Sequence, residues 1–189
     1  MGRRLADLAR GSSVTRDSYA AGGAANVALN IASLGGAPSL AGRTGTDEGG
    51  ERLSEILSQN GVVRVPGFSG ESCQTIQKTR IMVRNQQLCR IDREGGEAEY
   101  RMDSNASRSE LVEALGQADA VLLSDYGKGA ISENLIEWLQ GEAESMGIPV
   151  SLDPKPRRRL TFKGMDLLTP NRAEALELAG LSPHLRGKF

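Results

Sequence analysis

Two adjacent glycines, Gly22 and Gly23, stand directly before a run with strong helical periodicity, and Asn26 follows one turn into that run. The N-terminus of a helix carries free N–H groups and about half a positive charge, so glycine there lets a ligand oxygen approach the backbone itself. The amide of Asn26 can both donate a hydrogen bond to a hydroxyl group and accept one from it. These residues suit a polyol ligand. The alternative is a simple tight turn, with Asn26 on a solvated face.

Polar residues follow three strands in the second half of the chain that we expect to be buried, and these residues are Asp125, Asp153 and Asn171. Helices are expected between the strands, and strands that alternate with helices form right-handed units with a mostly parallel sheet. Ligands of such sheets bind beyond the carboxyl ends of the strands. We therefore expect the three polar residues to share one edge of the sheet.

Several cationic side chains are placed where an anionic ligand could meet them. Lys128 stands between two glycines in the loop after one expected strand, and Lys155 lies one loop further along. A lysine in such a loop can meet a phosphate as a mobile point charge, or it can belong to an ordinary solvated turn. Arg84 and Arg90 lie on a predicted hairpin, where they could cover an anionic ligand or keep a surface strand soluble.

Asn171 and Glu174 lie one turn apart on one face of the last predicted helix. Oxygen atoms at this spacing could hold a hydrated Mg²⁺ ion or the water around it. An asparagine cap with a glutamate at the third helical residue is equally an ordinary capping box. Taken alone, the spacing favours the capping box.

Composition and motif content exclude several classes of protein. With 189 residues, 39% hydrophobic content and a net charge of −1, the chain is typical of one globular domain and gives no electrostatic sign of a nucleic-acid partner. The basic run at 156–159 is balanced by acidic residues elsewhere. No G-x-x-x-x-G-K-[ST] pattern occurs, which excludes a P-loop. Because no apolar stretch suits a membrane span or a signal peptide, we expect no membrane partner and a cytoplasmic location.

Cysteine and histidine usage gives little support to metal or relay chemistry. Cys73 and Cys89 have neither a CxxC spacing nor further cysteine partners, so we expect buried or half-buried thiols. His184 is the single histidine and lies in the tail, so neither a Ser-His-Asp relay nor a histidine-rich metal site is indicated.

The elements that must position these residues follow from periodicity and capping signals. Asp47 is the predicted N-cap of the second helix, and Ser107 with Glu110 forms a predicted capping box for the third. A hairpin is indicated by the β-branched residues of 75–92, and its charged content argues that one of its faces is not core. We expect helices over 24–34, 47–61, 107–115, 132–146 and 171–180, strands at 38–42, 120–123, 149–152 and 165–169, and a hairpin turn at 85–87.

Five segments of the chain, taken in their order, resemble the ribokinase-like, or PfkB, family of sugar kinases. They look most like the heptose 7-phosphate kinase domain of bifunctional ADP-heptose synthases. The match runs from about Gly22 to about Gly180, and its segments are GGAANVALNIASLGG, KTRIMVRNQQLCRID, LLSDYGKGAIS, LDPK and LLTPNRAEALEL. The resemblance implies an α/β ribokinase-like fold, a mostly parallel sheet flanked by helices with a small β lid. The folded part is expected over 20–180 with the lid at about 73–92, between a poorly fixed segment 1–19 and a tail 181–189.

The resemblance also implies roles for the residues singled out above. The sugar would be held at Gly22, Gly23, Asn26 and Asp125, and the sugar phosphate would be met by Lys128, with the hairpin carrying Arg84 and Arg90 as part of a lid. The nucleotide phosphates and Mg²⁺ would lie near Lys155, Asn171 and Glu174, the metal through water. The implied reaction moves the terminal phosphoryl group of ATP to the anomeric hydroxyl of heptose 7-phosphate, and the implied assembly is a homodimer or another self-association.

The sequence departs from this family at both ends. The family's catalytic aspartate lies in a Gly-Ala-Gly-Asp motif that forms an anion hole, and the motif does not occur in these 189 residues. Residues 1–19 do not resemble the family's opening strand. Asp125 or Asp153 could stand in for the base, but the anion hole would still be missing. We therefore expect a truncated fold with no catalytic residue and negligible kinase activity; a binding module without catalysis and a decayed fragment are the alternatives.

Overall fold

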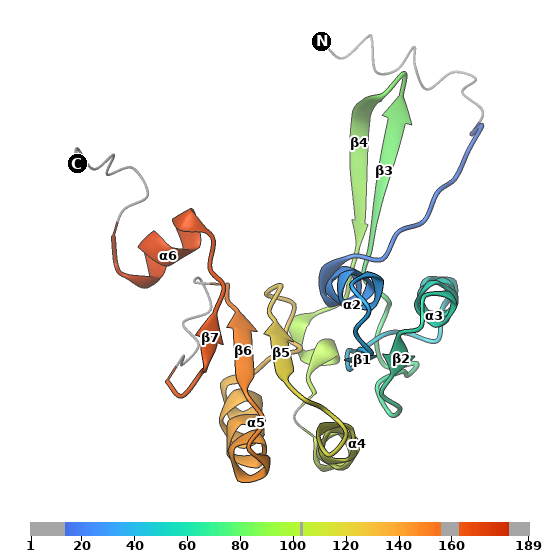
Figure 1. Cartoon of the computed structure of the whole chain (residues 1–189). Coiled ribbons are helices and arrows are strands. Elements are labelled where there is room, and N and C mark those ends of the chain that lie inside the picture. Colours follow the sequence, from blue (N-terminus) through green and yellow to red (C-terminus); the bar gives the residue numbers. More distant parts are fainter. Residues whose placement is uncertain (1–13, 103, 156–162, 182–189) are drawn as a thin grey trace.

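The computed structural model describes residues 14–102, 104–155 and 163–181, which form parallel strands, helices and one long hairpin (Figure 1). Residues 14–19 are exposed and have no regular structure. The basic run 156–159, His184 and most of the predicted tail lie outside the described residues. The elements in chain order are α2 (Gly23–Ser33), β1 (Ser39–Leu40), α3 (Glu48–Gln59), β2 (Val63–Arg64), β3 (Gln77–Val83), β4 (Gln86–Arg93), the 3-10 turn η1 (Glu97–Tyr100), α4 (Asn105–Leu115), β5 (Val121–Ser124), α5 (Glu133–Met146), β6 (Val150–Asp153), β7 (Leu167–Leu168) and α6 (Arg172–Leu178).

Most helix ends follow the predicted capping chemistry. The side chain of Asp47 accepts a hydrogen bond from the Gly50 N–H and begins α3. Ser132 caps α5 by accepting from the Leu135 N–H, and Gly147 ends that helix in the left-handed conformation. These ends lie where the sequence predicts them.

One predicted cap is wrong. The structure begins α4 at the N-cap Ser104, whose hydroxyl accepts from the Ser107 N–H, one turn before the predicted capping box of Ser107 and Glu110. The two serines offer the same capping chemistry, so the local pattern does not distinguish them. The Ser107 side chain is buried and its hydroxyl lies 2.8 Å from that of Ser104, and this burial extends the helix by a turn.

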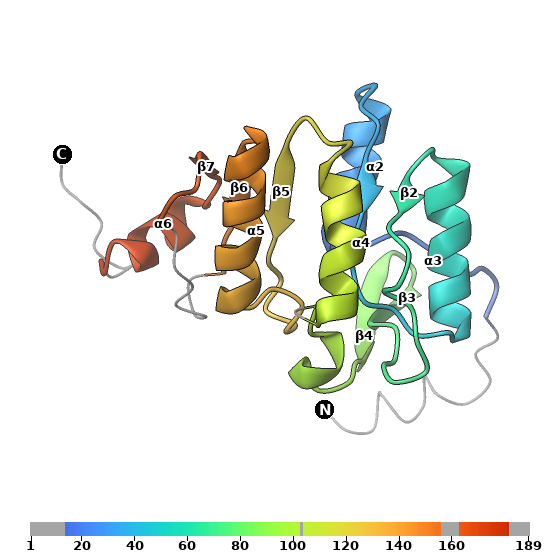
Figure 2. The same ribbon diagram turned by 90° about the horizontal axis from the view of Figure 1, so that it is seen from below.

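The three parallel strands β5, β6 and β7 are covered by helix α5 on one face (Figure 2). Leu123 and Leu152, which pair in the ladder, point into a core with Ile136 of α5. On the other face Leu122 is 41% exposed and Leu167 57% exposed. The expectation of wholly buried strands is therefore wrong for β5 and β7, because no described helix covers their second face.

The parallel strands form two groups in the described residues. Strands β1 and β2 pair with each other, Ser39 opposite Val63, and neither is hydrogen-bonded to the group of β5, β6 and β7. Strands must lie about 4.8 Å apart to share a ladder, so packing has to join the two groups instead. A shared core does this, and its buried members are Val65, Phe68, Met102, Leu111 and Leu135. The α/β class is confirmed, although the parallel sheet is not continuous.

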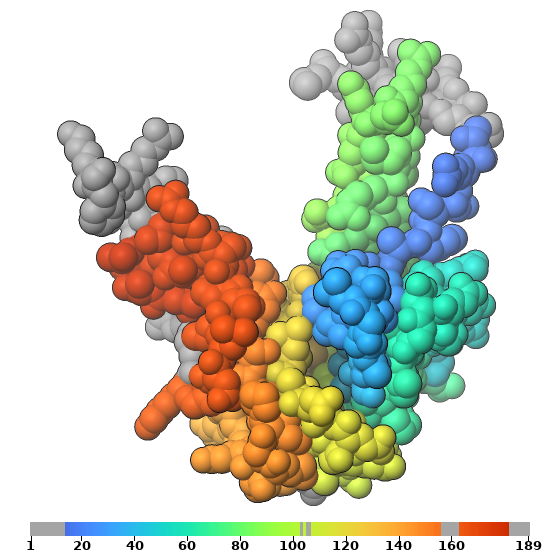
Figure 3. Space-filling model, in the orientation of Figure 1, coloured from blue at the N-terminus to red at the C-terminus, as the bar shows by residue number. Residues whose placement is uncertain are grey.

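The predicted hairpin is present as β3 and β4, which are antiparallel and stand out from the body (Figures 1 and 3). Arg84 and Asn85 form its turn with φ of 48° and 64°, a left-handed pair typical of a two-residue hairpin loop. The turn predicted at 85–87 is therefore wrong by one residue, because Gln86 and Gln87 already pair in β4. All residues of the two strands except Gln77 are exposed. Both faces, and not one, are therefore outside the core.

The two cysteines differ in their surroundings. Cys73 is buried, as expected, and its thiol lies 3.8 Å from the Gly70 carbonyl. Cys89 is exposed on β4 opposite Ile81, which contradicts the expectation of a buried or half-buried thiol. The reason is that no described segment packs on the hairpin. None of the described helices is both long enough and apolar enough to cross a membrane.

Candidate functional site

The carboxyl ends of β5, β6 and β7 lie at one edge, which faces the hollow between the hairpin and α6 (Figure 3). The N–H of Asp125 donates to the carbonyl of Asp153 over 3.1 Å, which joins the ends of β5 and β6. The N–H of Thr169 donates to the carbonyl of Leu152 over 3.1 Å, and Asn171 follows two residues later. The three polar residues predicted to share an edge therefore do so. We call this region the carboxyl edge.

Helix α2 brings its glycine N-terminus to the same edge. Gly23 has φ of 57°, and a Cβ atom added to it would lie 3.6 Å from the ring of Tyr126, which directly follows Asp125. Gly22 is the N-cap with φ of −120°, and a Cβ atom there would meet no atom within 4 Å. The two glycines thus differ: Gly23 is favoured by its positive φ and lies next to the ring, whereas Gly22 faces open space.

Asn26 is exposed one turn into α2, and its side chain makes no hydrogen bond with another described residue. Together with the N–H groups at the start of the helix, it leaves hydrogen-bonding capacity facing solvent. The neighbouring Ala25 and Ala28 are buried against α3, so the direction of Asn26 is set by the packing of the helix. This end of the carboxyl edge can receive hydroxyl groups without giving up internal contacts.

Two carboxylates lie side by side at the centre of the edge. Asp125 is only 2% exposed, and its Oδ1 accepts from the Gly127 N–H over 2.8 Å. Burial raises the pKa of Asp153; the charge of Lys155 opposes that rise, and the carboxylates of Glu174 and Asp125 add to it. A concentration of negative charge at this point suits hydroxyl donors or a cation more than a bare anion.

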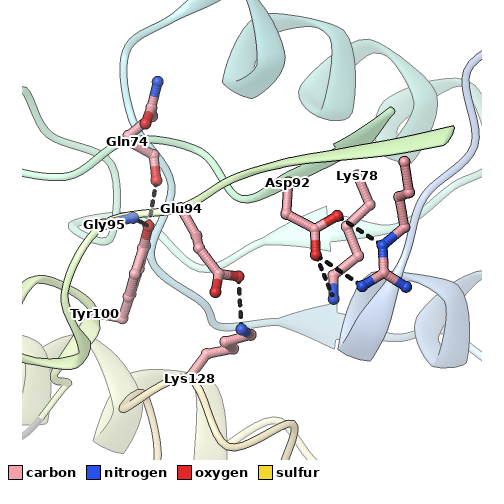
Figure 4. Close-up of polar contacts among 8 residues, drawn as sticks. Gln74, Lys78, Asp92, Glu94, Gly95, Tyr100 and Lys128 are labelled. Carbon is pink, nitrogen blue, oxygen red and sulfur yellow. Dashed lines mark hydrogen bonds and ion pairs between the residues drawn. The ribbon is translucent and has the colours of Figure 1, made fainter. Parts of the chain in front are cut away.

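Lys128 is held at the base of the hairpin. Its Nζ lies 2.5 Å from an oxygen of Glu94, which directly follows β4 (Figure 4). Beside this pair the Tyr100 hydroxyl donates to the Gln74 carbonyl over 2.9 Å and accepts from the Gly95 N–H over 2.7 Å. The predicted phosphate-binding lysine thus has a carboxylate partner that an anionic ligand would have to displace.

The side chains of Asn171 and Glu174 form the capping box. Asn171 Oδ1 accepts from the N–H groups of Ala173 and Glu174, each over 3.0 Å. Glu174 accepts from the Asn171 N–H over 2.9 Å and from Lys155 Nζ over 2.7 Å. The hydrogen bond from Lys155, then that from the Asn171 N–H, lowers the pKa of Glu174, and the pKa of Lys155 is raised in return.

These contacts bear on the predicted metal site. Every side-chain oxygen that Asn171 and Glu174 could offer already accepts a hydrogen bond, so direct coordination of Mg²⁺ would require rearrangement. Among the described residues no group of three or more His, Cys, Asp or Glu side chains could hold a metal ion. The residues present do not fit a directly coordinated metal, and contact through water stays a prediction.

The arginines predicted to cover a ligand lie on the hairpin. Arg84 is in the turn, at the end of the hairpin far from α2 (Figure 1). Arg90 donates to both carboxylate oxygens of Asp92 on the same strand, over 2.8 and 3.0 Å, and Lys78 approaches Asp92 to 3.9 Å (Figure 4). The structure therefore does not bring Arg84 to the carboxyl edge, and Arg90 already has a carboxylate partner.

Two features of the edge were not predicted from the sequence. The ion pair between Lys155 and Glu174 joins residues 19 positions apart, for which no local signal exists. The ring of Tyr126 lies near both Gly23 and Lys155, whose Nζ is 5.9 Å from the ring centroid. A signal for Tyr126 was available, because it directly follows Asp125 at the end of a predicted strand, and ligands of parallel sheets bind beyond the carboxyl ends of the strands.

A second hollow lies near the base of the hairpin. Burial works to raise the pKa of its carboxylate Asp47, but hydrogen bonds from Thr75 and Gly50 together lower it. Asp47 both caps α3 and holds the Thr75 N–H over 2.9 Å, so its role is structural. The lining residues are Thr46, Asp47, Glu71, Ser72, Cys73, Gln74 and Glu99.

Comparison with known proteins gives consistent matches. The family model described as pfkB family carbohydrate kinase matches residues 6–184. The chain is 43% identical over 164 residues to the bifunctional protein HldE of Proteus mirabilis, covering 85% of this chain and 33% of that protein. It is 42% identical over 160 residues to the bifunctional protein HldE of Pseudomonas syringae pv. syringae, covering 84% of this chain and 32% of that protein. The chain thus spans about a third of the length of these curated relatives.

Solved structures share the fold. The ribokinase of Arabidopsis thaliana, solved with ribose and ATP, has a TM-score of 0.65 at 22% identity, covering 92% of this chain and 56% of that one. A carbohydrate kinase from Agrobacterium tumefaciens has a TM-score of 0.64 at 22% identity, covering 90% of this chain and 58% of that one. At these identities the likeness shows the ribokinase-like fold alone, and the expected fold is confirmed.

Proposed function

We propose, since the chain belongs to the pfkB family of carbohydrate kinases, that it forms the sugar-binding part of an ATP-dependent heptose 7-phosphate kinase. One observation carries this proposal most: the glycine N-terminus of α2 meets the carboxyl edge at Tyr126, beside the buried Asp125. The N–H donors at the start of α2 and the carboxylate acceptor of Asp125 at the end of β5 then lie at one hollow. The identity to the bifunctional HldE proteins supports the choice of a heptose phosphate among sugars.

Each residue of the edge has a part in this proposal. Asn26 and the N–H groups at Gly22 and Gly23 bind sugar hydroxyls, and Asp125 accepts from a further one. Lys128 binds the phosphate of the sugar after leaving Glu94, because a phosphate dianion offers more charge than one carboxylate. The hairpin with Arg84 and Arg90 borders the hollow and acts as the lid, which must move to bring Arg84 near the edge.

The nucleotide side is proposed to involve Lys155, Asn171 and Glu174. Lys155 supplies positive charge for the nucleotide phosphates, and the capping box holds the start of α6 beside it. ATP would bring Mg²⁺ with its own phosphate ligands, which is how this ion commonly binds, and Asn171 and Glu174 would contact it through water only. The metal would neutralise charge on the transferred group.

Rapid turnover needs more than these residues. Phosphoryl transfer relies on positioning, on charge stabilisation and on a carboxylate that takes the hydroxyl proton. The Gly-Ala-Gly-Asp motif is absent from the 189 residues, and removal of one anion-hole donor alone costs about 100-fold or more in other enzymes. We therefore propose that residues 1–189 by themselves bind the sugar phosphate and turn over slowly, below about 0.1 per second against about 1 to 100 for kinases.

Self-association through the hairpin is part of the proposal. Ile81 and Cys89 are cross-strand partners, and Thr79 and Ile91 are another pair on the same face. Ile81 is 40% exposed and Ile91 48% exposed, so an apolar strip is open to solvent. Analytical ultracentrifugation should show a dimer that Ile81→Lys dissociates; a monomer at all concentrations would contradict this part.

Titration calorimetry with heptose 7-phosphate and, separately, with ATP tests the function. Sugar-phosphate binding without rapid turnover is the expected result, and binding of both ligands with turnover above about 0.1 per second would make the chain a working kinase. Absence of sugar-phosphate binding would sink the proposal. Asn26→Ala should weaken the binding, whereas Asn30→Ala, one turn further along the same exposed face of α2, is the matched control.

A further inference from the structure

Tyr126 is an aromatic residue that stays open to solvent at the carboxyl edge. It directly follows the buried Asp125 and is 45% exposed. Aromatic side chains contribute most when their large surface is covered, so a half-open ring beside a ligand-binding edge leaves apolar area for a partner. The described residues that approach the ring do not cover it.

The ring lies beside the N-terminus of helix α2. A Cβ atom added to Gly23 would lie 3.6, 3.7 and 3.8 Å from three carbon atoms of the ring, which is ordinary van der Waals contact. Since Gly23 has no side chain, it does not make this contact and leaves more of the ring uncovered. The open ring therefore lies next to the helix end whose N–H groups face solvent.

Lys155 approaches the same ring, but it does not depend on the ring for its position. Its Nζ is 5.9 Å from the ring centroid, at the outer limit of a cation–π contact, which is about 6 Å. The carboxylate of Glu174 lies much nearer, at 2.7 Å, and is the group that fixes Lys155. The ring is therefore not needed to hold Lys155 in place.

We propose that Tyr126 is a specificity-determining residue whose ring packs on the carbon–hydrogen face of the sugar ring. This inference rests on the proposed function and deepens it. A cyclic sugar has polar hydroxyl groups at its rim and an apolar face, and Asn26 can bind the rim while a rigid aromatic ring covers the face. The site would then select cyclic sugar phosphates over open-chain polyol phosphates of the same charge.

Three variants of the full chain test this role by titration calorimetry with heptose 7-phosphate. Tyr126→Phe keeps the ring and should bind within about twofold of the original chain, whereas Tyr126→Ala should bind about tenfold more weakly. Tyr19→Ala is the matched control, because Tyr19 is also an exposed tyrosine, at 59%, and its ring lies under Arg52 of α3. It should leave the affinity unchanged.

Two further readouts separate contact with the sugar from a structural role. Heptose 7-phosphate should perturb the near-ultraviolet tyrosine absorption of the original chain, and Tyr126→Phe should abolish that signal while binding persists. Inorganic phosphate, which probes the lysines alone, should bind Tyr126→Ala as it binds the original chain.

The outcomes distinguish this inference from the proposed function. Equal sugar-phosphate affinity of Tyr126→Ala and the original chain overturns the role of the ring and leaves the proposed function standing. An equal loss of inorganic phosphate and sugar-phosphate affinity in Tyr126→Ala overturns it as well, because the ring would then support the lysines. If the original chain binds no sugar phosphate, the proposed function fails and the inference fails with it.

Discussion

The two ends of the carboxyl edge carry similar polar groups in opposite states. At the α2 end, Asn26 makes no hydrogen bond with another described residue and Gly22 faces open space. At the α6 end, Asn171 and Glu174 bind each other's backbone, and Glu174 also binds Lys155. Binding at the α2 end requires only the displacement of water, whereas binding at the α6 end competes with existing contacts. For this reason the sugar is proposed to bind at the α2 end.

The largest expected effect comes from substitutions in the core under the strands, which support both ends of the carboxyl edge. Ile136 of α5 is fully buried under the strands that form the edge. Ile136→Ala should lower the free energy of unfolding by about 2–5 kcal/mol, and Ile136→Val by about 0.5–1.5 kcal/mol, in urea unfolding followed by circular dichroism. A loss below about 1 kcal/mol in the alanine variant would show that this one-sided core does not hold the edge.

Substitution of each glycine by alanine should distinguish the effect of backbone strain from the effect of ligand contact at the α2 end. Gly23→Ala places a side chain at φ of 57° and against Tyr126, so it should cost about 1–2 kcal/mol of stability. Gly22→Ala has extended backbone and open space, so its stability should change by less than about 1 kcal/mol.

Sugar binding gives the second half of this test. The methyl group of Gly22→Ala would occupy the space that a hydroxyl oxygen needs, so heptose 7-phosphate should bind at least about tenfold more weakly in calorimetry. Unchanged affinity in Gly22→Ala would show that no ligand approaches the backbone there, and it would remove the contrast between the two ends.

The ion pair at the α6 end should make the stability of the folded chain depend on pH in the acid range. Because the pKa of Glu174 is lowered below its usual 4.5 in the folded chain, the unfolded chain binds more protons as the pH falls. The stabilisation is present above about pH 4.5 and is lost as the pH falls through the folded-state pKa. Glu174→Gln should cost up to about 1 kcal/mol at pH 7 and flatten the acid limb of a stability profile measured by urea unfolding.

A neighbouring glutamate controls for the loss of one charge on α6. Glu177 lies on the same helix, is exposed and has no ion pair among the described residues. Glu177→Gln should keep the acid limb that Glu174→Gln loses. If both variants behave alike, the pair with Lys155 does not stabilise the folded chain.

The smallest expected effect on stability concerns the ion pair between Lys128 and Glu94. Their side chains are 32% and 35% exposed, so the pair contributes about 0–1 kcal/mol. Glu94→Gln should leave stability nearly unchanged and tighten inorganic phosphate binding by up to about fivefold, because Lys128 is released. Calorimetry with Glu97→Gln, which removes a nearby exposed charge without a described ion pair, is the control; equal behaviour would show that Glu94 does not compete with phosphate.

Much of the fold was predictable because its signals are local. The N-caps Asp47, Ser132 and Asn171 are each followed by an amphipathic run, and a helix cap acts over three or four residues. The polar residues at the strand ends were predicted to meet because alternating strands and helices leave few topologies. The wrong cap at Ser107 shows the limit, since two serines three residues apart compete and burial chooses between them.

The amino-acid sequence by itself determined most of the helix caps, the presence of the hairpin and the common edge of Asp125, Asp153 and Asn171. Only the tertiary structure decided that Lys155 pairs with Glu174, that Lys128 pairs with Glu94 and that the Tyr126 ring lies beside Gly23. The physical reason is the distance along the chain over which each interaction acts. Helix caps and turns depend on neighbours a few residues away, whereas ion pairs that span 19 and 34 residues depend on how strands and loops pack in space.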